Sequence, residues 1–310
     1  MAPQRRVGLL GTGTIGSGWA ATYLAQGYSV VAHDPSDEAE PRTRAYLDRV
    51  WPMVRRTMPQ APDAVPRDRL VFGSAADAVT GVEMVHESGP ESVEVKRAVF
   101  AQVESAAAAD LLILSSSGGL MPSDLQAEME HPDRLVVAHP LSPVYALPLV
   151  EVLGGRETSV AAVERTAQHL EELGKHVVVL RREIPGYLTN RLTFALLREA
   201  VHCLAEGVAG PQEIEDAVVY GVTPRWIKGG AVTSLALAGG PAGMRGVVGA
   251  FAGAIDGWWA DLGTPTMTPE IRELLVEAAD AILDGRTFEE VLEERDTAAV
   301  GLVEKFHPGP

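Results

Sequence analysis

The sequence predicts an α/β protein in which a doubly wound, mostly parallel sheet is followed by an all-helical C-terminal domain. Short apolar runs alternate with amphipathic helical stretches through the first part of the chain. From residue 185 onward the strand signal disappears and long helical patterns replace it. We therefore expect two domains, residues 1–183 with the sheet and residues 184–310 with helices only.

Residues 6–34 are expected to form a strand, a glycine turn, a helix and a second strand. In the turn, Gly11 allows a tight bend, Gly13 lets the backbone approach a pyrophosphate, and Gly16 lets helix and strand pack closely. The free amides at the helix N-terminus favour an anion. The pattern is typical of a Rossmann-like dinucleotide site, to which Thr14 and Ile15 also belong.

Asp34 ends the second strand, near the spacing at which a carboxylate accepts hydrogen bonds from the ribose hydroxyls. A 2′-phosphate would be repelled there, so the acid favours NAD over NADP. Glycines are also common in ordinary turns. Here the strand before the motif, the helix after it and the acid at its spacing all support a dinucleotide-binding site.

The other elements follow in alternation along the chain. Further strands of the sheet are expected at residues 70–72, 83–87, 111–114, 135–138, 148–153 and 177–180. Helices are expected between them at residues 37–58, 75–79 and 91–107. The helical domain is expected to contain helices at residues 186–206, 211–220, 229–237, 241–262, 269–284 and 288–305. Doubly wound sheets bind ligands at the carboxyl ends of their strands, so the cleft is expected there.

Composition excludes several classes of partner. The formal net charge of −16 disfavours nucleic acid and anionic membrane surfaces. A single cysteine, Cys203, rules out a framework of internal disulfides and favours a reducing compartment. No long apolar segment precedes the first strand. We expect a cytoplasmic protein without a membrane span, and no metal site.

A candidate acid–base pair lies on two neighbouring predicted strands. His139 ends one apolar strand, and Glu151 lies on the next. A histidine titrates near neutral pH, and a glutamate that binds its ring nitrogen would stabilise the imidazolium. From its position alone, His139 is either a structural histidine or a base.

Four stretches resemble the 3-hydroxyacyl-CoA dehydrogenase superfamily, most closely its L-carnitine dehydrogenase and lambda-crystallin-type gulonate dehydrogenase subgroup. They are residues 11–16, the His139-Pro140 segment with residues 147–151, residues 185–191, and residues 238–245. The resemblance implies that His139 removes the hydroxyl proton while hydride leaves the same carbon for NAD. Glu151 would orient the histidine, and Asn190 would bind the reacting oxygen, although a helix cap is the alternative.

The resemblance also implies further cofactor contacts. Glu91 and Lys96 match an acid and a lysine that border the nicotinamide ribose, and a solvated pair on one helix is the alternative. Ser116, in the turn after the strand at 111–114, is assigned to the cofactor site as well.

Two positions depart from the family pattern. Gly118 falls where the family usually has a serine that contacts the reacting oxygen, and Ser142 replaces an asparagine. Ser117 is adjacent, and we assign all three residues to the substrate site. The loss of one donor to a developing oxyanion costs on the order of 100-fold in rate.

The subgroup acts on small free 3-hydroxy acids. Arg191 and Arg245 suit a small carboxylate, and Trp226 suits a cationic group, although tryptophans of this kind also serve as core or dimer-interface residues. The main hypothesis is an NAD-dependent dehydrogenase of a carnitine-like 3-hydroxy acid, acting as a homodimer through the helical domain. The alternatives are a 3-hydroxyacyl-thioester dehydrogenase and a non-redox or non-catalytic relative that still binds NAD.

Overall fold

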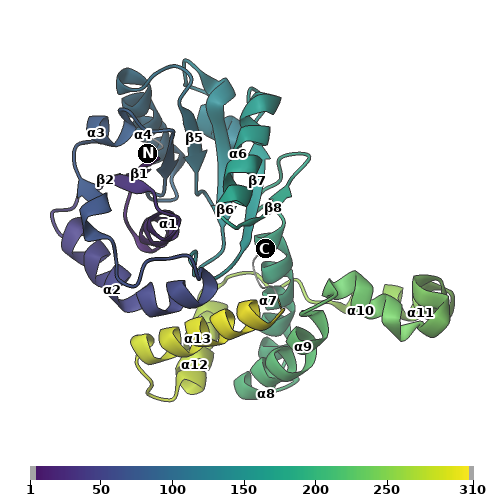
Figure 1. Cartoon of the computed structure of the whole chain (residues 1–310). Helices are drawn as coiled ribbons and strands as arrows, with labels where there is room; N and C mark the ends of the chain where they lie inside the picture. The colour runs from purple at the N-terminus through teal and green to yellow at the C-terminus, as the bar shows by residue number, and fades with distance from the viewer. Residues whose placement is uncertain (1–4, 307–310) are drawn as a thin grey trace. The chain divides into compact units, whose positions relative to one another are not determined.

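The computed structural model describes residues 5–306, which form two compact units (Figure 1). Of the described residues, the first unit contains residues 5–190 and 295–306. The second unit is Arg191–Glu294. Residues 295–306 thus belong with the sheet, whereas the predicted boundary at 183/184 assigns them to the helical domain.

The first unit is built on one sheet of eight strands in the order β3-β2-β1-β4-β5-β6-β7-β8. The strands are β1 Arg6–Leu10, β2 Ser29–His33, β3 Leu70–Phe72, β4 Met84–Glu87, β5 Leu112–Ser115, β6 Leu135–Pro140, β7 Leu149–Gly154 and β8 His176–Val179. Every neighbouring pair is parallel except β6 and β7, which run antiparallel. The predicted fold class is therefore confirmed, and every predicted strand is present.

Helices cover both faces of this sheet. They are α1 Thr14–Ala25, α2 Ala39–Thr57, α3 Ala75–Val79, α4 Val93–Ala106, α5 Pro122–Gln126 and α6 Val160–Glu172, with 3-10 turns at Arg67–Arg69 and Pro132–Arg134. The helix expected at residues 91–107 begins at Val93, because the Ser92 hydroxyl accepts the amide of Val95 and caps it. Helices α5 and α6 were not predicted from the sequence.

Two apolar cores lie on the two faces of the sheet. Val7 and Leu9 of β1 pack into one core with α1, α2 and α6, whereas Leu10 packs into the other with α3 and α4. Neighbouring strand residues point to opposite faces, so one short strand supplies both cores. Each fully buried Leu or Val contributes about 1.5–3 kcal/mol.

The remaining helices are α7 Thr189–Ala205, α8 Pro211–Asp216, α9 Thr223–Trp226, α10 Gly230–Ala238, α11 Gly243–Asp261, α12 Pro269–Leu283 and α13 Phe288–Phe306, with a π segment at Ala217–Val222 and a 3-10 turn at Gly240–Ala242. The helix expected at residues 186–206 begins only at Thr189. Gly186 and Tyr187 have φ angles of 72° and 49°, which a right-handed helix does not accept. None of the helices among residues 5–306 has the length and apolar character needed to cross a membrane.

Candidate active site

The glycine turn between β1 and α1 has the geometry that a dinucleotide needs. Gly11 has a φ of 88°, and a Cβ there would lie 2.8 Å from the carbonyl carbon of Ser88. A Cβ on Gly16 would lie 2.0 Å from the Gly11 oxygen, so the backbone of the helix packs directly against the backbone of the turn with no room for a side chain. A Cβ on Gly13 would meet nothing within 4 Å, which leaves the turn open to a ligand.

Thr14 and Ile15 begin α1 directly after this turn, so their amides belong to the free N-terminus of the helix. Beside them is a pocket of about 490 Å³ that Thr12, Gly13 and Thr14 line together with Arg42 and Arg49 of α2. Free amides and guanidinium groups both attract phosphate oxygens. The residues present therefore fit the pyrophosphate of a dinucleotide.

Asp34 follows β2 and is fastened to the same turn. One carboxylate oxygen accepts the amide of Thr12 at 2.7 Å and its hydroxyl at 3.1 Å, and the other accepts the amide of Ser36 at 3.1 Å. Burial alone would raise the pKa of Asp34, but these hydrogen bonds outweigh it and lower the pKa below its usual value. An ionised, fixed acceptor therefore stands at the end of β2.

His139 and Glu151 are directly opposite each other on β6 and β7. Nδ1 of His139 lies 2.9 Å from Oε2 of Glu151, and both side chains are buried. Glu151 also accepts the amides of Leu188 and Thr189 at 2.9 Å and the Thr189 hydroxyl at 2.6 Å. Burial alone would raise the pKa of Glu151, but its donors, His139 first, outweigh this and lower it.

This carboxylate settles which ring nitrogen of His139 is free. An ionised carboxylate only accepts hydrogen bonds, so Nδ1 carries the hydrogen and Nε2 of the neutral ring keeps its lone pair. A Cβ built on Gly118 would lie 3.4 Å from Nε2 and 3.6 Å from Nδ2 of Asn190. Asn190 donates to the Gly118 carbonyl at 2.7 Å. His139 and Asn190 thus both lie within about 4 Å of the position that a side chain at residue 118 would occupy.

Glu91 binds the turn that contains Gly118. Its Oε1 accepts the Ser117 hydroxyl at 2.7 Å and the amides of Gly118 and Gly119 at 2.9 and 3.0 Å. Glu91 precedes α4, so the alternative of a solvated pair on one helix is wrong. Ser117 is fully buried, and its hydroxyl is engaged with Glu91 instead of facing the space beside His139.

Lys96 is also buried, in an ion pair that the sequence analysis did not identify. Its Nζ donates to both carboxylate oxygens of Glu87 at 2.8 Å, and Glu91 is more distant at 3.7 Å. The Ser115 hydroxyl donates to Glu87 at 2.7 Å. Glu87 is the last residue of β4, which pairs with β1, the strand before the glycine turn. Its position at the carboxyl end of a strand was the signal in the sequence that could have identified Glu87 as a site residue.

Ser116 connects this region to α1. Its hydroxyl accepts the indole N–H of Trp19 at 3.1 Å and lies 3.0 Å from the hydroxyl of Ser88. Ser88 in turn faces the bare backbone of Gly11 and Gly16. The predicted cofactor residue therefore lies beside the glycine turn.

Tyr187 is a site residue to which the sequence analysis gave no role. It is fully buried, adopts a φ of 49°, and contacts the His139 ring edge-on at 5.5 Å. Its hydroxyl donates to the Leu120 carbonyl at 2.5 Å and lies 3.2 Å from the Ser117 hydroxyl. A non-glycine residue in the left-handed region costs about 1–3 kcal/mol and occurs often at functional sites.

Four further residues were assigned to the substrate: Ser142, Arg191, Trp226 and Arg245. Ser142 is an exposed residue of the connection between β6 and β7. Arg191, Trp226 and Arg245 belong to the second unit, on α7, α9 and α11, and all three are exposed. Their assignment to the substrate remains a prediction.

Comparison with known proteins identifies the family. Residues 6–184 match the 3-hydroxyacyl-CoA dehydrogenase NAD binding domain, and residues 186–245 match the C-terminal domain of the same family. The chain is 40% identical to L-carnitine dehydrogenase of Pseudomonas aeruginosa, over 95% of this chain and 91% of that protein. It is 36% identical to the L-carnitine dehydrogenase of Oceanobacillus iheyensis, over 97% and 98% of the two chains.

Solved structures agree with this result. A 5-formyl-3-hydroxy-2-methylpyridine 4-carboxylic acid 5-dehydrogenase superposes with a TM-score of 0.82 over 99% of this chain and all of the other, at 24% identity, and so shares the fold. (S)-3-hydroxybutyryl-CoA dehydrogenase from Ralstonia eutropha gives a TM-score of 0.64 over 80% and 88%, at 25% identity. The chain belongs to the 3-hydroxyacyl-CoA dehydrogenase family and is an NAD-dependent oxidoreductase.

Proposed function

We propose that this oxidoreductase oxidises the 3-hydroxyl of a small, carnitine-like hydroxy acid to the 3-oxo acid, with His139 as general base. One observation carries the proposal. Glu151 binds Nδ1 of His139 at 2.9 Å, so the lone pair of Nε2 is directed to the space beside Gly118 and Asn190. NAD, when bound, accepts the hydride from the substrate carbon.

The proton of the substrate hydroxyl passes to Nε2 of His139, which becomes an imidazolium. Glu151 supports that positive charge without itself taking the proton, because four hydrogen bonds keep the carboxylate ionised. Asn190 lies 3.6 Å from the Cβ position of Gly118, within reach of an oxygen placed there. It therefore positions the reacting oxygen next to the base.

The substrate class rests on the relatives and on the bare backbone at Gly118. Several relatives of nearly full length are named L-carnitine dehydrogenase. Because Gly118 has no side chain, the space next to Nε2 is available to the substrate itself. We assign the carboxylate of the acid to Arg191 or Arg245 and its cationic group to Trp226, since guanidinium groups pair with carboxylates and aromatic faces attract cations.

A substrate screen followed by one substitution tests the proposal. L-carnitine, other free 3-hydroxy acids and 3-hydroxybutyryl-CoA are each incubated with NAD, and NADH formation is measured. We expect a free acid to give the highest kcat/KM. With that acid, His139→Gln should lower kcat by about 100-fold or more, while the Kd for NAD changes by less than about twofold.

The matched control is His131→Gln, which changes an exposed histidine. It should leave both constants unchanged. A wild-type rate for His139→Gln contradicts the base role, and a preference for the CoA thioester contradicts the substrate class.

A further inference from the structure

The connection between β6 and β7, residues 141–148, joins the proposed base to its carboxylate partner. Val144, Tyr145 and Ala146 within it are 1%, 1% and 3% exposed. Connections of this kind normally run over the surface, because a buried one must find partners for its polar backbone groups. The groups that form hydrogen bonds with the backbone of this connection therefore help to position His139.

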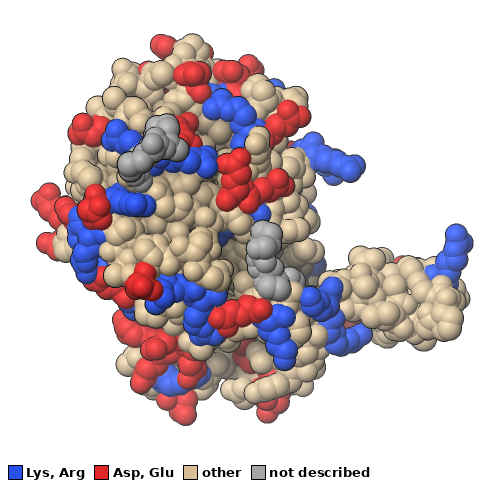
Figure 2. Space-filling view, in the orientation of Figure 1, with Lys and Arg blue, Asp and Glu red and all other residues tan. Residues whose placement is uncertain are grey.

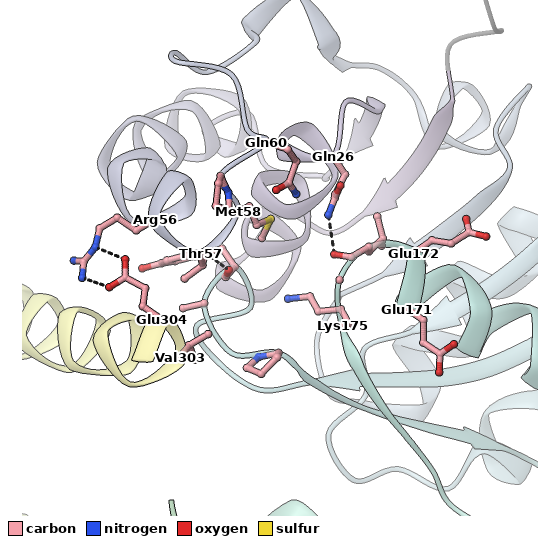
Figure 3. Close-up of a pocket in the computed structure, with 16 residues that line it drawn as sticks. Gln26, Arg56, Thr57, Met58, Gln60, Glu171, Glu172, Lys175, Val303 and Glu304 are labelled. Carbon is pink, nitrogen blue, oxygen red and sulfur yellow. Dashed lines mark hydrogen bonds and ion pairs between the residues drawn. The ribbon is translucent and has the colours of Figure 1, made fainter. Parts of the chain in front are cut away.

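Lys175 supplies two of those partners. It precedes β8, is 7% exposed, and its Nζ donates to the carbonyls of Val144 and Leu147. Figure 3 shows its side chain directed into a cavity of about 440 Å³ that also has walls from α2 and α13. Within residues 5–306 it forms no ion pair, since Glu172 pairs with Arg5 and Glu304 with Arg56.

The hydrogen bonds of Lys175 Nζ go to carbonyls, and Nζ also lies 5.6 Å from the centre of the Trp19 ring; without a carboxylate partner, a buried ammonium is costly. Burial lowers the pKa of Lys175 to about 7, which expresses how poorly the site solvates the charge. What the protein gains is geometric, because one Nζ, charged or neutral, donates to two backbone carbonyls at once. Here these hydrogen bonds fix two carbonyls, three residues apart, of a single connection.

Other elements hold the same connection from different sides. The Tyr145 hydroxyl donates to Asp296 of α13 at 2.7 Å, and the Thr57 hydroxyl of α2 donates to the Tyr145 carbonyl at 3.2 Å. A Cβ on Gly18 of α1 would lie 2.8 Å from Cβ of Val144, so the cofactor helix contacts the connection at bare backbone. The connection therefore lies between the base and the helix that follows the glycine turn.

We infer that Lys175 is a positioning residue for the dehydrogenase reaction, since its bonds to Val144 and Leu147 hold His139 opposite Glu151 and the connection against α1. The inference rests on the proposed role of His139. Lys175 does not touch the reacting atoms; it acts through the backbone that carries them. An error of about 1 Å in such a placement is enough to cost 100-fold in rate.

A double-mutant cycle tests this inference. Lys175→Met keeps an unbranched side chain that is one heavy atom shorter and removes all of its donors. We expect kcat for the best substrate of the screen to fall by about 10-fold or more, with the Kd for NAD changed by less than about threefold. In the His139→Gln background the same substitution should change kcat by less than about twofold, because its target is already absent.

The control is Lys305→Met, an exposed lysine of the first unit, which should leave kcat unchanged in both backgrounds. Far-ultraviolet circular dichroism shows whether each variant is folded. If Lys175→Met does not fold, Lys175→Gln carries the same cycle, since it keeps a polar group at the site but its amide ends one bond short of the Nζ that reaches the two carbonyls.

The outcomes separate the two proposals. If Lys175→Met lowers kcat by the same factor in the wild-type and His139→Gln backgrounds, or does not lower it in the wild-type background, Lys175 is not a positioning residue. His139 then remains the proposed base. A wild-type rate for His139→Gln contradicts the proposed function and, with it, this inference.

Discussion

At the scale of single residues, the site consists of ionised carboxylates that are fixed by several donors. Asp34 accepts three hydrogen bonds, and Glu151 accepts four. Each is thereby held in one orientation, and the donors keep it ionised although it is partly buried, since burial alone would raise its pKa. Glu151 directs the lone pair of a histidine, whereas Asp34 presents an acceptor at the end of β2.

Replacement of Asp34 by alanine tests how NAD is selected. The substitution removes the acceptor for the ribose hydroxyls and the charge that repels a 2′-phosphate, while Arg42 nearby remains. We expect the Kd for NAD to rise by about 10-fold and the preference for NAD over NADP to shrink by a similar factor. Fluorescence titration with both dinucleotides measures this.

The control for this experiment is Asp37→Ala, which removes an exposed acid from the same loop. It should leave both affinities unchanged. An unaltered ratio of the two affinities in Asp34→Ala would show that selectivity arises elsewhere.

At the scale of elements, the glycine turn and the strands could be predicted because their signals are local. The apolar runs, the glycines at 11, 13 and 16, and the acid at 34 all lie within short windows of sequence. The pairing of His139 with Glu151 was also accessible, since they lie on consecutive strands, although the antiparallel direction of β6 and β7 was not specified.

Long-range contacts account for what the sequence analysis did not identify. Lys96 pairs with Glu87 across two elements, and Tyr187 reaches Ser117 from 70 residues away. Helix α7 begins late because Gly186 and Tyr187 have positive φ angles. A positive φ angle at a tyrosine is uncommon, so the sequence does not predict it. Such features depend on the assembled sheet and leave no periodic signal.

The packing of α1 against α6 makes stability depend on pH. His169 of α6 is 4% exposed and lies 3.0 Å from the Tyr23 hydroxyl of α1. Burial lowers its pKa to about 4, and burial also holds the pKa of His86 well below its usual value. An unfolded histidine titrates near 6.5, so between about pH 6.5 and 4 the unfolded chain binds more protons.

The free energy of unfolding should therefore fall as pH falls through this window. His169 alone should account for about 2 kcal/mol between about pH 7 and pH 5. His169→Gln retains a partner for Tyr23 but does not titrate, so its unfolding free energy should lose about 2 kcal/mol less over the same interval. Urea unfolding at the two pH values measures this, with His131→Gln as the control. Equal losses in His169→Gln and wild type would contradict the assignment.

At the scale of the whole molecule, the helices of the second unit expose several large apolar side chains. Val201 is the one buried residue of α7, and Val247 is the one buried residue of α11. Phe194 on α7 is 60% exposed, and Trp258 and Trp259 on α11 are 64% and 69% exposed. Figure 2 shows few charged side chains over α10 and α11. Large apolar patches of this kind mark interaction surfaces.

We expect a second copy of this chain to cover these helices, so that the protein is a homodimer. Stable interfaces bury about 1,200–2,000 Å² in total, with aromatic residues enriched at their centres. A symmetric pair uses one patch twice, so a single substitution affects both sides of the interface. Light scattering at low micromolar concentration should give about twice the monomer mass of 32.9 kDa.

Trp258→Asp should convert the dimer to monomer, because it places a charge in the apolar contact of both subunits at once. Val160→Asp is the matched control, since Val160 is 73% exposed at the start of α6 in the first unit. It should leave the mass unchanged. If the wild-type chain itself scatters as a monomer, or if Trp258→Asp remains a dimer, these helices are not the contact between subunits, and their exposed tryptophans serve another ligand.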